Sequence, residues 1–321
     1  MTIMLDTVRD ALNPVNAALQ ELQRAPLPPA IEPFVPPALP PIVPTPERLP
    51  AAPVDSDWAQ GVSGQQSQPI DLEMAQISDA VYDPSQTQVG NWTRVSDADL
   101  TAAGIDPASF ENADTGLRAG LYTDGNGHYT LAFAGSNDST DWLVANPQQG
   151  LGFQNEQYDQ AVALAQQVAN SPFGNQGNLV ITGHSLGGGL ASISALVVGA
   201  PAVTFNASGV HDNTLRQFGL DPATAKTDAA DGQIRRYNIE ADPLTNAQQD
   251  TWGLRDAMPD ALGHEIVLDT PPSKLERPDW DWRHPIESGK AEGQYQLDRL
   301  AEPHLSGTVI DAMQQQRPWE S

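Results

Sequence analysis

Hydrophobic positions along the middle of the chain follow the spacings of regular secondary structure. Residues 72–81 repeat apolar side chains at helical spacing and predict a helix that ends before Pro84. Residues 117–122 and 129–134 predict two strands. The segment between them, Asp124–Gly127, reads Asp-Gly-Asn-Gly, which is typical of a tight turn, so the two strands are expected to form a hairpin.

After this hairpin, predicted helices alternate with predicted strands. An amphipathic helix over residues 156–169 precedes a short apolar run, Leu179–Ile181, which is typical of a buried strand and is followed by a helix rich in Ala, Ser and Leu. Further strands are expected at 202–205 and 234–240, and a last helix at about 305–315. This order predicts an α/β fold with a mostly parallel sheet that carries helices on both faces.

The N-terminal part of the chain has a different pattern. Residues 1–24 place apolar side chains in alternating steps of four and three, which predicts a helix with one apolar seam. That helix either docks on its own domain or serves as a handle for a delivery or neutralising partner through residues 1–53. Dense proline after it favours an extended spacer, and a polar, flexible stretch follows. We therefore predict a helical segment (1–24), a Pro-rich then polar linker (25–68) and a folded domain (69–321).

One region of the predicted domain lacks periodicity. Residues 270–300 are rich in Trp, Pro and charged side chains, and we expect them to form a long loop. A loop of this length in a compact domain is more often functional than idle. The part around Trp280 and Trp282 is a candidate for covering a site or touching a ligand, and packing on the domain is the alternative.

Charge and residue usage restrict the partners and the kinds of site. With 41 acidic and 16 basic residues the chain has a formal net charge of −25, so phosphate backbones repel it and nucleic acid is not an expected partner. The absence of cysteine excludes disulfides, thiolate metal sites and a Cys nucleophile. No His-Glu-x-x-His or phosphate-loop sequence is present, so we expect no metal and no other cofactor.

Targeting signals are also missing from the pattern. No apolar run approaches the roughly 18 residues that a membrane span needs. The N-terminus lacks a basic region followed by an uninterrupted apolar core. We expect a protein that is made in the cytoplasm without a recognisable signal peptide.

The most informative motif is Gly183-His184-Ser185-Leu186-Gly187. It is a complete Gly-x-Ser-x-Gly between a predicted strand and a predicted helix, the context that a nucleophile on a sharp turn requires. Ser185 is expected to adopt a strained backbone conformation, which is tolerable because the two glycines carry no Cβ that would clash with the neighbouring chain. Ser185 is thus a candidate nucleophile at the positive end of the following helix.

Four segments together resemble the class 3 lipase branch of the α/β-hydrolases. They are Phe133–Asn137 with Asp141-Trp142 after it, Gly183–Gly187, Ile239–Pro243 and Pro303–Ser306. The likeness spans roughly residues 72–315, and the chain departs from many relatives in having Ala134 where an Arg often stands. The resemblance implies an α/β-hydrolase fold and hydrolysis of lipid esters. Bacterial members with an N-terminal extension resemble phospholipase A1-type and secreted antibacterial lipase effectors, which implies export by a specialised secretion system.

In α/β-hydrolases the nucleophile comes first along the chain, then the acid, then the histidine base. Of six histidines, His264, His284 and His304 satisfy this order of serine, acid and histidine. We favour His304, because it stands where a loop meets an amphipathic helix. His284 lies in the Trp-rich region, and His264 has a second interpretation as a residue at a strand edge. His184, beside the nucleophile, is expected to point elsewhere and to make structural hydrogen bonds.

The acid and the oxyanion donors are predicted from position in the same way. Asp242 follows an apolar strand directly, so its carboxylate is expected at the sheet edge beside the serine, although a cap before a proline is also a common role for Asp. Asp250 and Asp269 are alternatives. The expected oxyanion donors are the backbone N–H groups of Leu186 and of Ser136, whose hydroxyl can donate as well.

These residues predict a serine hydrolase that works through a Ser-His-Asp triad and an acyl-enzyme. The resemblance implies that it cleaves carboxyl esters of lipids at a membrane surface, as a lipase or phospholipase A1. Because the chain is acidic, apolar contacts rather than charge would bring it to lipid. The same site could instead carry out acyl transfer or cleave thioesters, because the first half-reaction is common to all three. A catalytically inactive hydrolase fold that serves as a binding module is the alternative from another class.

Overall fold

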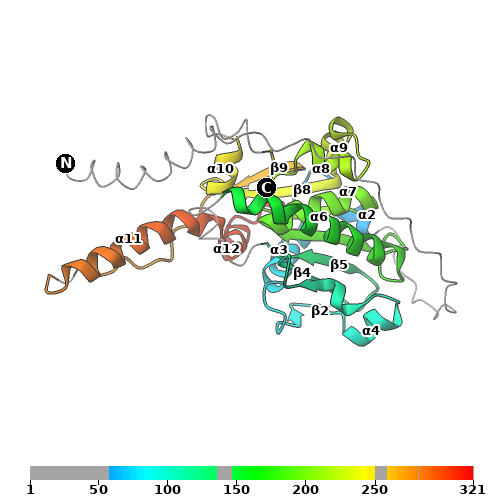
Figure 1. The fold of residues 1–321 in the computed structure, drawn as a ribbon, viewed down its shortest axis with the longest axis horizontal. Helices are drawn as coiled ribbons and strands as arrows, with labels where there is room; N and C mark the ends of the chain where they lie inside the picture. The colour runs from blue at the N-terminus through cyan, green and yellow to red at the C-terminus, as the bar shows by residue number, and fades with distance from the viewer. Residues whose placement is uncertain (1–57, 136–146, 250–258, 281, 321) are drawn as a thin grey trace. The chain divides into compact units, whose positions relative to one another are not determined.

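The computed structural model describes residues 58–135, 147–249, 259–280 and 282–320, and Figure 1 shows their helices and strands. The predicted segment 1–24 and the proline-rich stretch after it lie outside the described residues. No helix within the described ranges is long and apolar enough to cross a bilayer.

The strands within these ranges form one nine-stranded mixed sheet. They are β1 (Gln88–Val89), β2 (Trp92–Arg94), β3 (Glu111–Asn112), β4 (Leu117–Thr123), β5 (Tyr129–Phe133), β6 (Leu179–His184), β7 (Ala202–Phe205), β8 (Ile234–Ile239) and β9 (His264–Leu268). Their order is β1-β2-β4-β5-β6-β7-β8-β9, and β3 pairs with β4. The pairs from β5 to β9 are parallel, and those before β5 are antiparallel.

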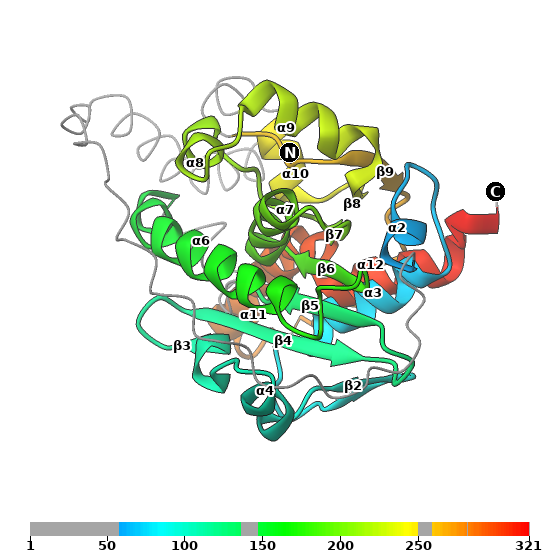
Figure 2. The ribbon, with the colours of Figure 1, turned by 90° about the vertical axis from the view of Figure 1, so that its right-hand side faces the viewer.

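Helices cover both faces of this sheet. The α-helices are α2 (Trp58–Val62), α3 (Ile70–Ala80), α4 (Asp97–Ala102), α6 (Pro147–Asn170), α7 (Leu186–Val198), α8 (Asp212–Gln217), α9 (Pro222–Asp228), α10 (Pro243–Gln249), α11 (Pro285–Ala301) and α12 (Ser306–Gln316), and short 3-10 turns include η1 (Pro107–Phe110), η3 (Glu302–His304) and η4 (Pro318–Glu320). Figure 2 shows α6 and α7 on one side of the sheet and α3 and α12 on the other. The predicted α/β-hydrolase fold with a mostly parallel sheet is confirmed.

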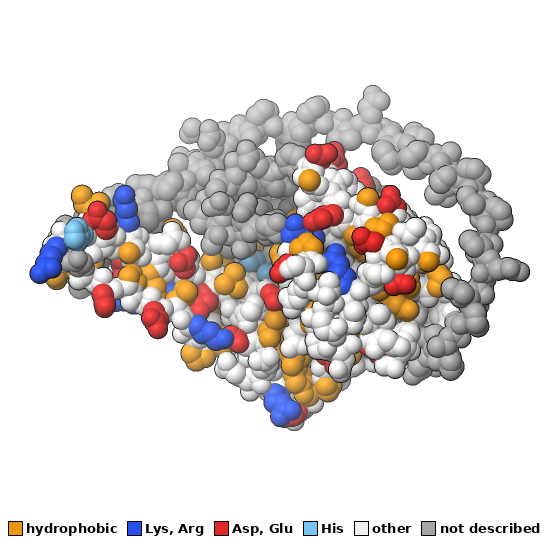
Figure 3. Space-filling model, turned by 90° about the horizontal axis from the view of Figure 1, so that it is seen from below, with side chains coloured by type: hydrophobic (Ala, Val, Ile, Leu, Met, Phe, Trp, Pro, Cys, Tyr) orange, Lys and Arg blue, Asp and Glu red, His pale blue; other side chains and the backbone are white. Residues whose placement is uncertain are grey.

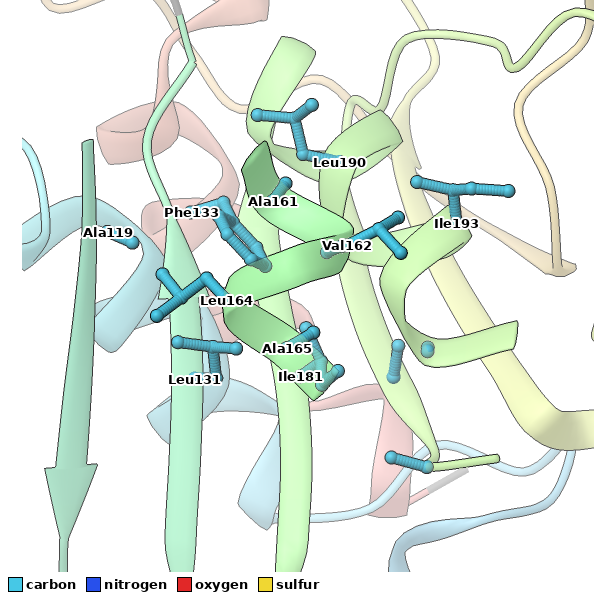
Figure 4. Packing of buried hydrophobic residues seen from close by; sticks show 14 of the residues in the cluster. Ala119, Leu131, Phe133, Ala161, Val162, Leu164, Ala165, Ile181, Leu190 and Ile193 are labelled. Carbon is cyan, nitrogen blue, oxygen red and sulfur yellow. The ribbon is translucent and has the colours of Figure 1, made fainter. Parts of the chain in front are cut away.

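Alternation along each strand divides the core into two layers, since successive side chains point to opposite faces. Leu131 and Phe133 of β5 belong to the cluster that Leu164 of α6 joins, and Figure 4 shows this packing at close range. Ala132, between them in sequence, belongs to the other cluster, which contains Ile77 of α3. Burial on both faces is the physical reason why the central strands read as continuous apolar runs.

The predicted hairpin is present, with β4 and β5 antiparallel on either side of the turn. Gly125 and Gly127 take positive φ values of 80° and 90°, which a Cβ would disfavour. Asp124 Oδ1 accepts the backbone N–H of Asn126 at 2.8 Å and closes the turn. The sequence Asp-Gly-Asn-Gly therefore forms this turn through backbone freedom and one local side-chain acceptor.

The prediction of a structureless stretch over residues 270–300 is wrong in its second half, where α11 is a helix of 17 residues. The helical period was hidden because α11 has few apolar residues, two glycines in its interior and no apolar stripe facing the core. Helix α6 also begins earlier than the predicted residue 156.

The predicted flexible stretch before residue 69 is corrected as well. Residues 58–62 form α2, and Ala59 and Val62 are buried. Arg235 of β8 holds this segment, because its Nη1 donates to the carbonyl oxygen of Gly64 at 3.0 Å while its Nε donates to Asp71 Oδ2 at 3.0 Å. A cation from the core strand thus fixes a polar segment that carries little apolar signal of its own.

Candidate active site

Ser185 lies on the sharp turn between β6 and α7. Its φ of 59° and ψ of −128° place a non-glycine residue in a strained backbone conformation. The predicted strain is therefore confirmed. The turn raises Ser185 above the carboxyl end of the central strand, where its side chain is only partly buried.

The two motif glycines permit this turn by close approach. A Cβ built on Gly183 would overlap the carbonyl group of Gly187, and one built on Gly187 would overlap the carbonyl oxygen of Phe133 at the end of β5. Both contacts are with backbone, which cannot swing aside. The expectation that only residues without a Cβ fit here is confirmed.

Three side chains that are far apart in the sequence meet at this turn. His304 Nε2 lies 2.8 Å from Ser185 Oγ, and His304 Nδ1 lies 2.7 Å from Asp242 Oδ1. Asp242 is fully buried and His304 is 2 % exposed. An ionised carboxylate only accepts, so Nδ1 carries the proton and Nε2 is left to accept from the serine hydroxyl. An imidazole oriented in this way can take a proton from the hydroxyl when the oxygen attacks a carbonyl.

Asp242 makes different contacts with its two carboxylate oxygens. While Oδ1 bonds His304, Oδ2 accepts the backbone N–H of Thr245 at 2.8 Å and the Thr245 hydroxyl at 2.6 Å. The first of these is an N-cap bond at the start of α10. The cap fixes the carboxylate in the orientation that the imidazole needs.

His184 makes structural hydrogen bonds, as predicted, and one of its partners is the backbone of His304. His184 Nε2 lies 2.6 Å from the carbonyl oxygen of His304, and Nδ1 lies 3.1 Å from the Tyr82 hydroxyl. Because a carbonyl can only accept, the proton is on Nε2 and Tyr82 donates to Nδ1. Burial, together with the neighbouring His304, lowers the pKa of His184 to about 3, so the ring is neutral at physiological pH.

Tyr82 extends this network to the end of β5. Its hydroxyl accepts the backbone N–H of Gly135 at 2.8 Å, and burial raises the pKa of the hydroxyl well above its ordinary value. A Cβ on Gly135 would press on Tyr82 Oη and on the carbonyl oxygen of His184. The Tyr82 hydroxyl therefore bonds both the His184 ring and the backbone of Gly135, the residue just before the expected oxyanion donor Ser136.

The two expected oxyanion donors have different outcomes. Leu186 is the first residue of α7, so its backbone N–H has no acceptor within the helix and is available beside Ser185. Ser136 lies outside the described residues, and its role stays a prediction.

Sequence reasoning missed Asn206, which follows β7. It is fully buried with a φ of 41°, and its Nδ2 donates to the carbonyl oxygens of Pro303 and His304 at 3.0 and 3.3 Å. Its Oδ1 accepts the backbone N–H of Ile239 at 2.9 Å. A polar residue directly after a buried parallel strand was the available signal. Tyr82 was missed too, and nothing in its local sequence distinguishes it from a core aromatic.

The structure also describes most of the alternative candidates for the base and the acid. His264 is the first residue of β9, in agreement with its second interpretation, and His284 precedes α11. Asp269 is held by α12, because its backbone N–H donates to Gln316 Oε1 at 3.0 Å. Asp250 lies outside the described residues. Within the part of the chain that the structure describes, no group of three or more His, Asp or Glu residues is arranged to hold a metal ion.

Comparison with known proteins places the chain in a family. The model of the Tle-like phospholipase domain matches residues 73–270, more than half of the chain. The chain belongs to the Tle-like phospholipase family. It is also similar to the extracellular phospholipase A1 of Serratia liquefaciens, with 44 % identity over 264 residues that cover 82 % of this chain and 76 % of that protein.

Membership in this phospholipase family confirms the expected class of enzyme, a lipid ester hydrolase, and the likeness to bacterial phospholipase A1-type lipases. Its substrates are lipids. The matched region contains Ser185 and Asp242 and ends before His304.

Proposed function

We propose that this chain is a phospholipase A1 in which Ser185 is the nucleophile, His304 the general base and Asp242 the acid that orients it. The observation that carries the proposal is the pair of hydrogen bonds, 2.8 and 2.7 Å long, that joins Ser185 Oγ to Asp242 through the imidazole of His304. Such a relay is the arrangement that activates a serine hydroxyl.

In the proposed reaction, Ser185 Oγ attacks the ester carbonyl carbon while His304 Nε2 takes the hydroxyl proton. The negative oxygen of the tetrahedral intermediate accepts from the N–H of Leu186 and from Ser136. Removing one such donor usually costs about 2.7–4 kcal/mol of transition-state stabilisation. His304 then protonates the leaving lysophospholipid, and a water activated by the same imidazole hydrolyses the acyl-enzyme.

The relative from Serratia supports the choice of the A1 position and of an extracellular site of action, because it is described as an extracellular phospholipase A1. We propose that this chain is likewise exported. We also propose that residues 1–53 act as a handle or spacer for a delivery or neutralising protein. Recovery of the chain from the culture medium, lost when these residues are deleted, is the expected result.

The decisive experiment compares wild type with Ser185→Ala on a phosphatidylcholine whose two acyl chains differ. Wild type should release the sn-1 fatty acid, and the variant should release none above background. Ser85→Ala is the matched control and should retain full activity, because Ser85 is exposed and its hydroxyl donates to the neighbouring Asp83. Equal hydrolysis by wild type and Ser185→Ala would refute the proposed nucleophile.

Acyl transfer, thioester cleavage and an inactive binding module are separated by two further readouts. A fluorophosphonate should label wild type and leave Ser185→Ala unlabelled, whereas a binding module would not react. Adding alcohol acceptors or acyl thioesters to the assay should leave free fatty acid from phospholipid as the main product. A dominant transferred product would favour an acyltransferase.

A further inference from the structure

Helix α11 turns its apolar side to solvent. Ile286, Gly289, Gly293, Leu297 and Leu300 follow one another in steps of three and four and so lie on one face, which we call the α11 apolar face. Ile286 is 72 % exposed and Leu300 is 68 % exposed. Helices of soluble domains normally place such a stripe against the core. This helix does the opposite.

The polar side of α11 is held by the segment that precedes the helix in the chain. Glu292 Oε2 and Oε1 accept from Arg277 Nε and Nη2 at 3.0 and 2.9 Å, and Ser288 is buried. At the end of the helix, Glu302 Oε1 accepts the backbone N–H of Lys274 at 2.8 Å. Ion pairs and hydrogen bonds thus orient the helix so that its apolar face points away.

The glycines of the α11 apolar face are open on their outer side. A Cβ at Gly289 or Gly293 would meet no atom within 4 Å. Figure 3 shows the same segment, at the end where Figure 1 draws α11, with hydrophobic side chains beside charged ones on the surface.

The C-terminal end of α11 is close in sequence to His304 of the candidate active site. Helix α11 ends at Ala301 and continues through η3, whose last residue is His304. Leu305, next in sequence, is 44 % exposed, and at the other end Trp280 and Trp282 are 45 % and 83 % exposed with ring centroids 5.6 Å apart. An apolar stripe flanked by aromatic rings and charged side chains is typical of a helix that lies in a membrane interface.

We propose that the α11 apolar face, with Trp280, Trp282 and Leu305 at its ends, docks the enzyme on the surface of a zwitterionic phospholipid bilayer. The net charge of −25 disfavours an anionic surface, so burial of apolar side chains is the attraction that remains. The inference rests on the proposed function in one respect: a phospholipase must bring its serine to an ester at the lipid surface. Docking beside His304 does this.

The test measures binding separately from catalysis. Full-length Ser185→Ala protein is sedimented with phosphatidylcholine vesicles. Two double variants, which combine Ser185→Ala with Leu300→Glu or with Gly293→Glu, are tested in the same way. Gly293→Glu introduces a charge where there is open space and a better helix former than glycine, so it should stay folded. Ala291→Glu is the matched control, because Ala291 is exposed and lies about 160° from Gly293 around the same helix.

Each substitution on the α11 apolar face should weaken vesicle binding by about tenfold or more, while Ala291→Glu should bind like the parent. In the Ser185 background, the same face variants should lose hydrolysis of vesicles and keep hydrolysis of a soluble short-chain ester. Unchanged vesicle binding by Leu300→Glu and Gly293→Glu would overturn the inference. The inference would also be overturned if these variants dissociated a dimer in gel filtration and left vesicle binding unchanged, because the face would then contact a second copy of the chain.

Failure of the proposed function has a different signature. Vesicle binding that depends on the α11 apolar face, in a wild-type protein that releases no fatty acid, would leave the docking surface standing and refute the phospholipase activity. Release of fatty acid with no dependence on this face would do the reverse.

Discussion

His184 Nε2 donates to the carbonyl oxygen of His304, so the residue before Ser185 supports the backbone of the residue whose imidazole bonds the Ser185 hydroxyl. The two rings also lie with centroids 5.0 Å apart. Asn206 adds a second donor to the same carbonyl. The position of the proposed base is therefore coupled to the turn that carries Ser185, independently of the bond to Asp242.

This coupling predicts different outcomes for two substitutions of His184. His184→Ala removes the donor and should lower kcat by about tenfold with little change in KM, in line with the loss of one hydrogen bond. His184→Gln offers an N–H near the position of Nε2 and should retain most of the activity. Steady-state kinetics on a soluble ester check this, with melting temperatures as the control for folding. Equal losses in both variants would contradict the positioning role.

The depressed pKa of His184 predicts a pH dependence of stability. The pKa of His184 is about 3 in the folded protein against an ordinary value of 6.5, so between these values the unfolded chain binds a proton that the folded chain excludes. Stability from this group is complete above pH 6.5 and falls as the pH drops. Relative to His184→Gln, which does not titrate, wild type should lose about 2 kcal/mol of unfolding free energy between pH 7 and pH 5. Urea titrations at both pH values measure it, and a constant difference between the proteins would contradict it.

Substitutions of Asp242 and of Thr245 should lower kcat by different amounts. Asp242→Asn removes the acceptor that keeps the proton on His304 Nδ1 and should lower kcat by about three to four orders of magnitude. Thr245→Val removes one donor to Oδ2 but keeps the backbone cap, so the loss should be closer to tenfold. Kinetics on a soluble ester compare them. Near wild-type activity in Asp242→Asn would exclude this residue as the acid.

The close approach at Gly187 predicts a folding defect. Gly187→Ala would force a methyl group into the backbone at the end of β5, so we expect an insoluble or strongly destabilised protein. Gly289→Ala, in open space on α11, is the matched control and should raise stability by up to about 1 kcal/mol. Thermal denaturation followed by circular dichroism decides, and equal melting temperatures would show that the turn can relax.

The buried pair of Asp71 and Arg235 predicts a large loss of stability. Both side chains are at most 1 % exposed, so Asp71→Asn leaves a buried guanidinium without its counter-charge and should cost about 3–5 kcal/mol. The pair of Glu111 and Arg118, whose side chains are 57 % and 27 % exposed, is the comparison, and Glu111→Gln should change stability by no more than about 1 kcal/mol. Chemical denaturation distinguishes the two. A small effect of Asp71→Asn would mean that water replaces the carboxylate.

Much of this molecule was readable from local sequence. The turn at Ser185 could be predicted, because the glycines, the apolar strand before it and the helix after it are neighbours in the chain. The parallel strands could be predicted as well, since burial on both faces leaves uninterrupted apolar runs in the sequence. In contrast, α11 was missed, because a helix held by ion pairs with its apolar side outward has no pattern that refers to the core.

Only the tertiary structure selected among the candidates for the relay. Three histidines satisfied the chain order, and His304 is the one that the fold brings to Ser185, across 119 residues of sequence, while Asp242 reaches it across 62. The contacts of Tyr82 and Asn206 with this site are likewise visible only in the tertiary structure, because their hydrogen-bond partners lie on other elements. Local spacing determines which segments become strands, helices and tight turns, because those depend on neighbouring residues. Which side chains share a proton depends on how the sheet assembles, and that is decided by packing over the whole domain.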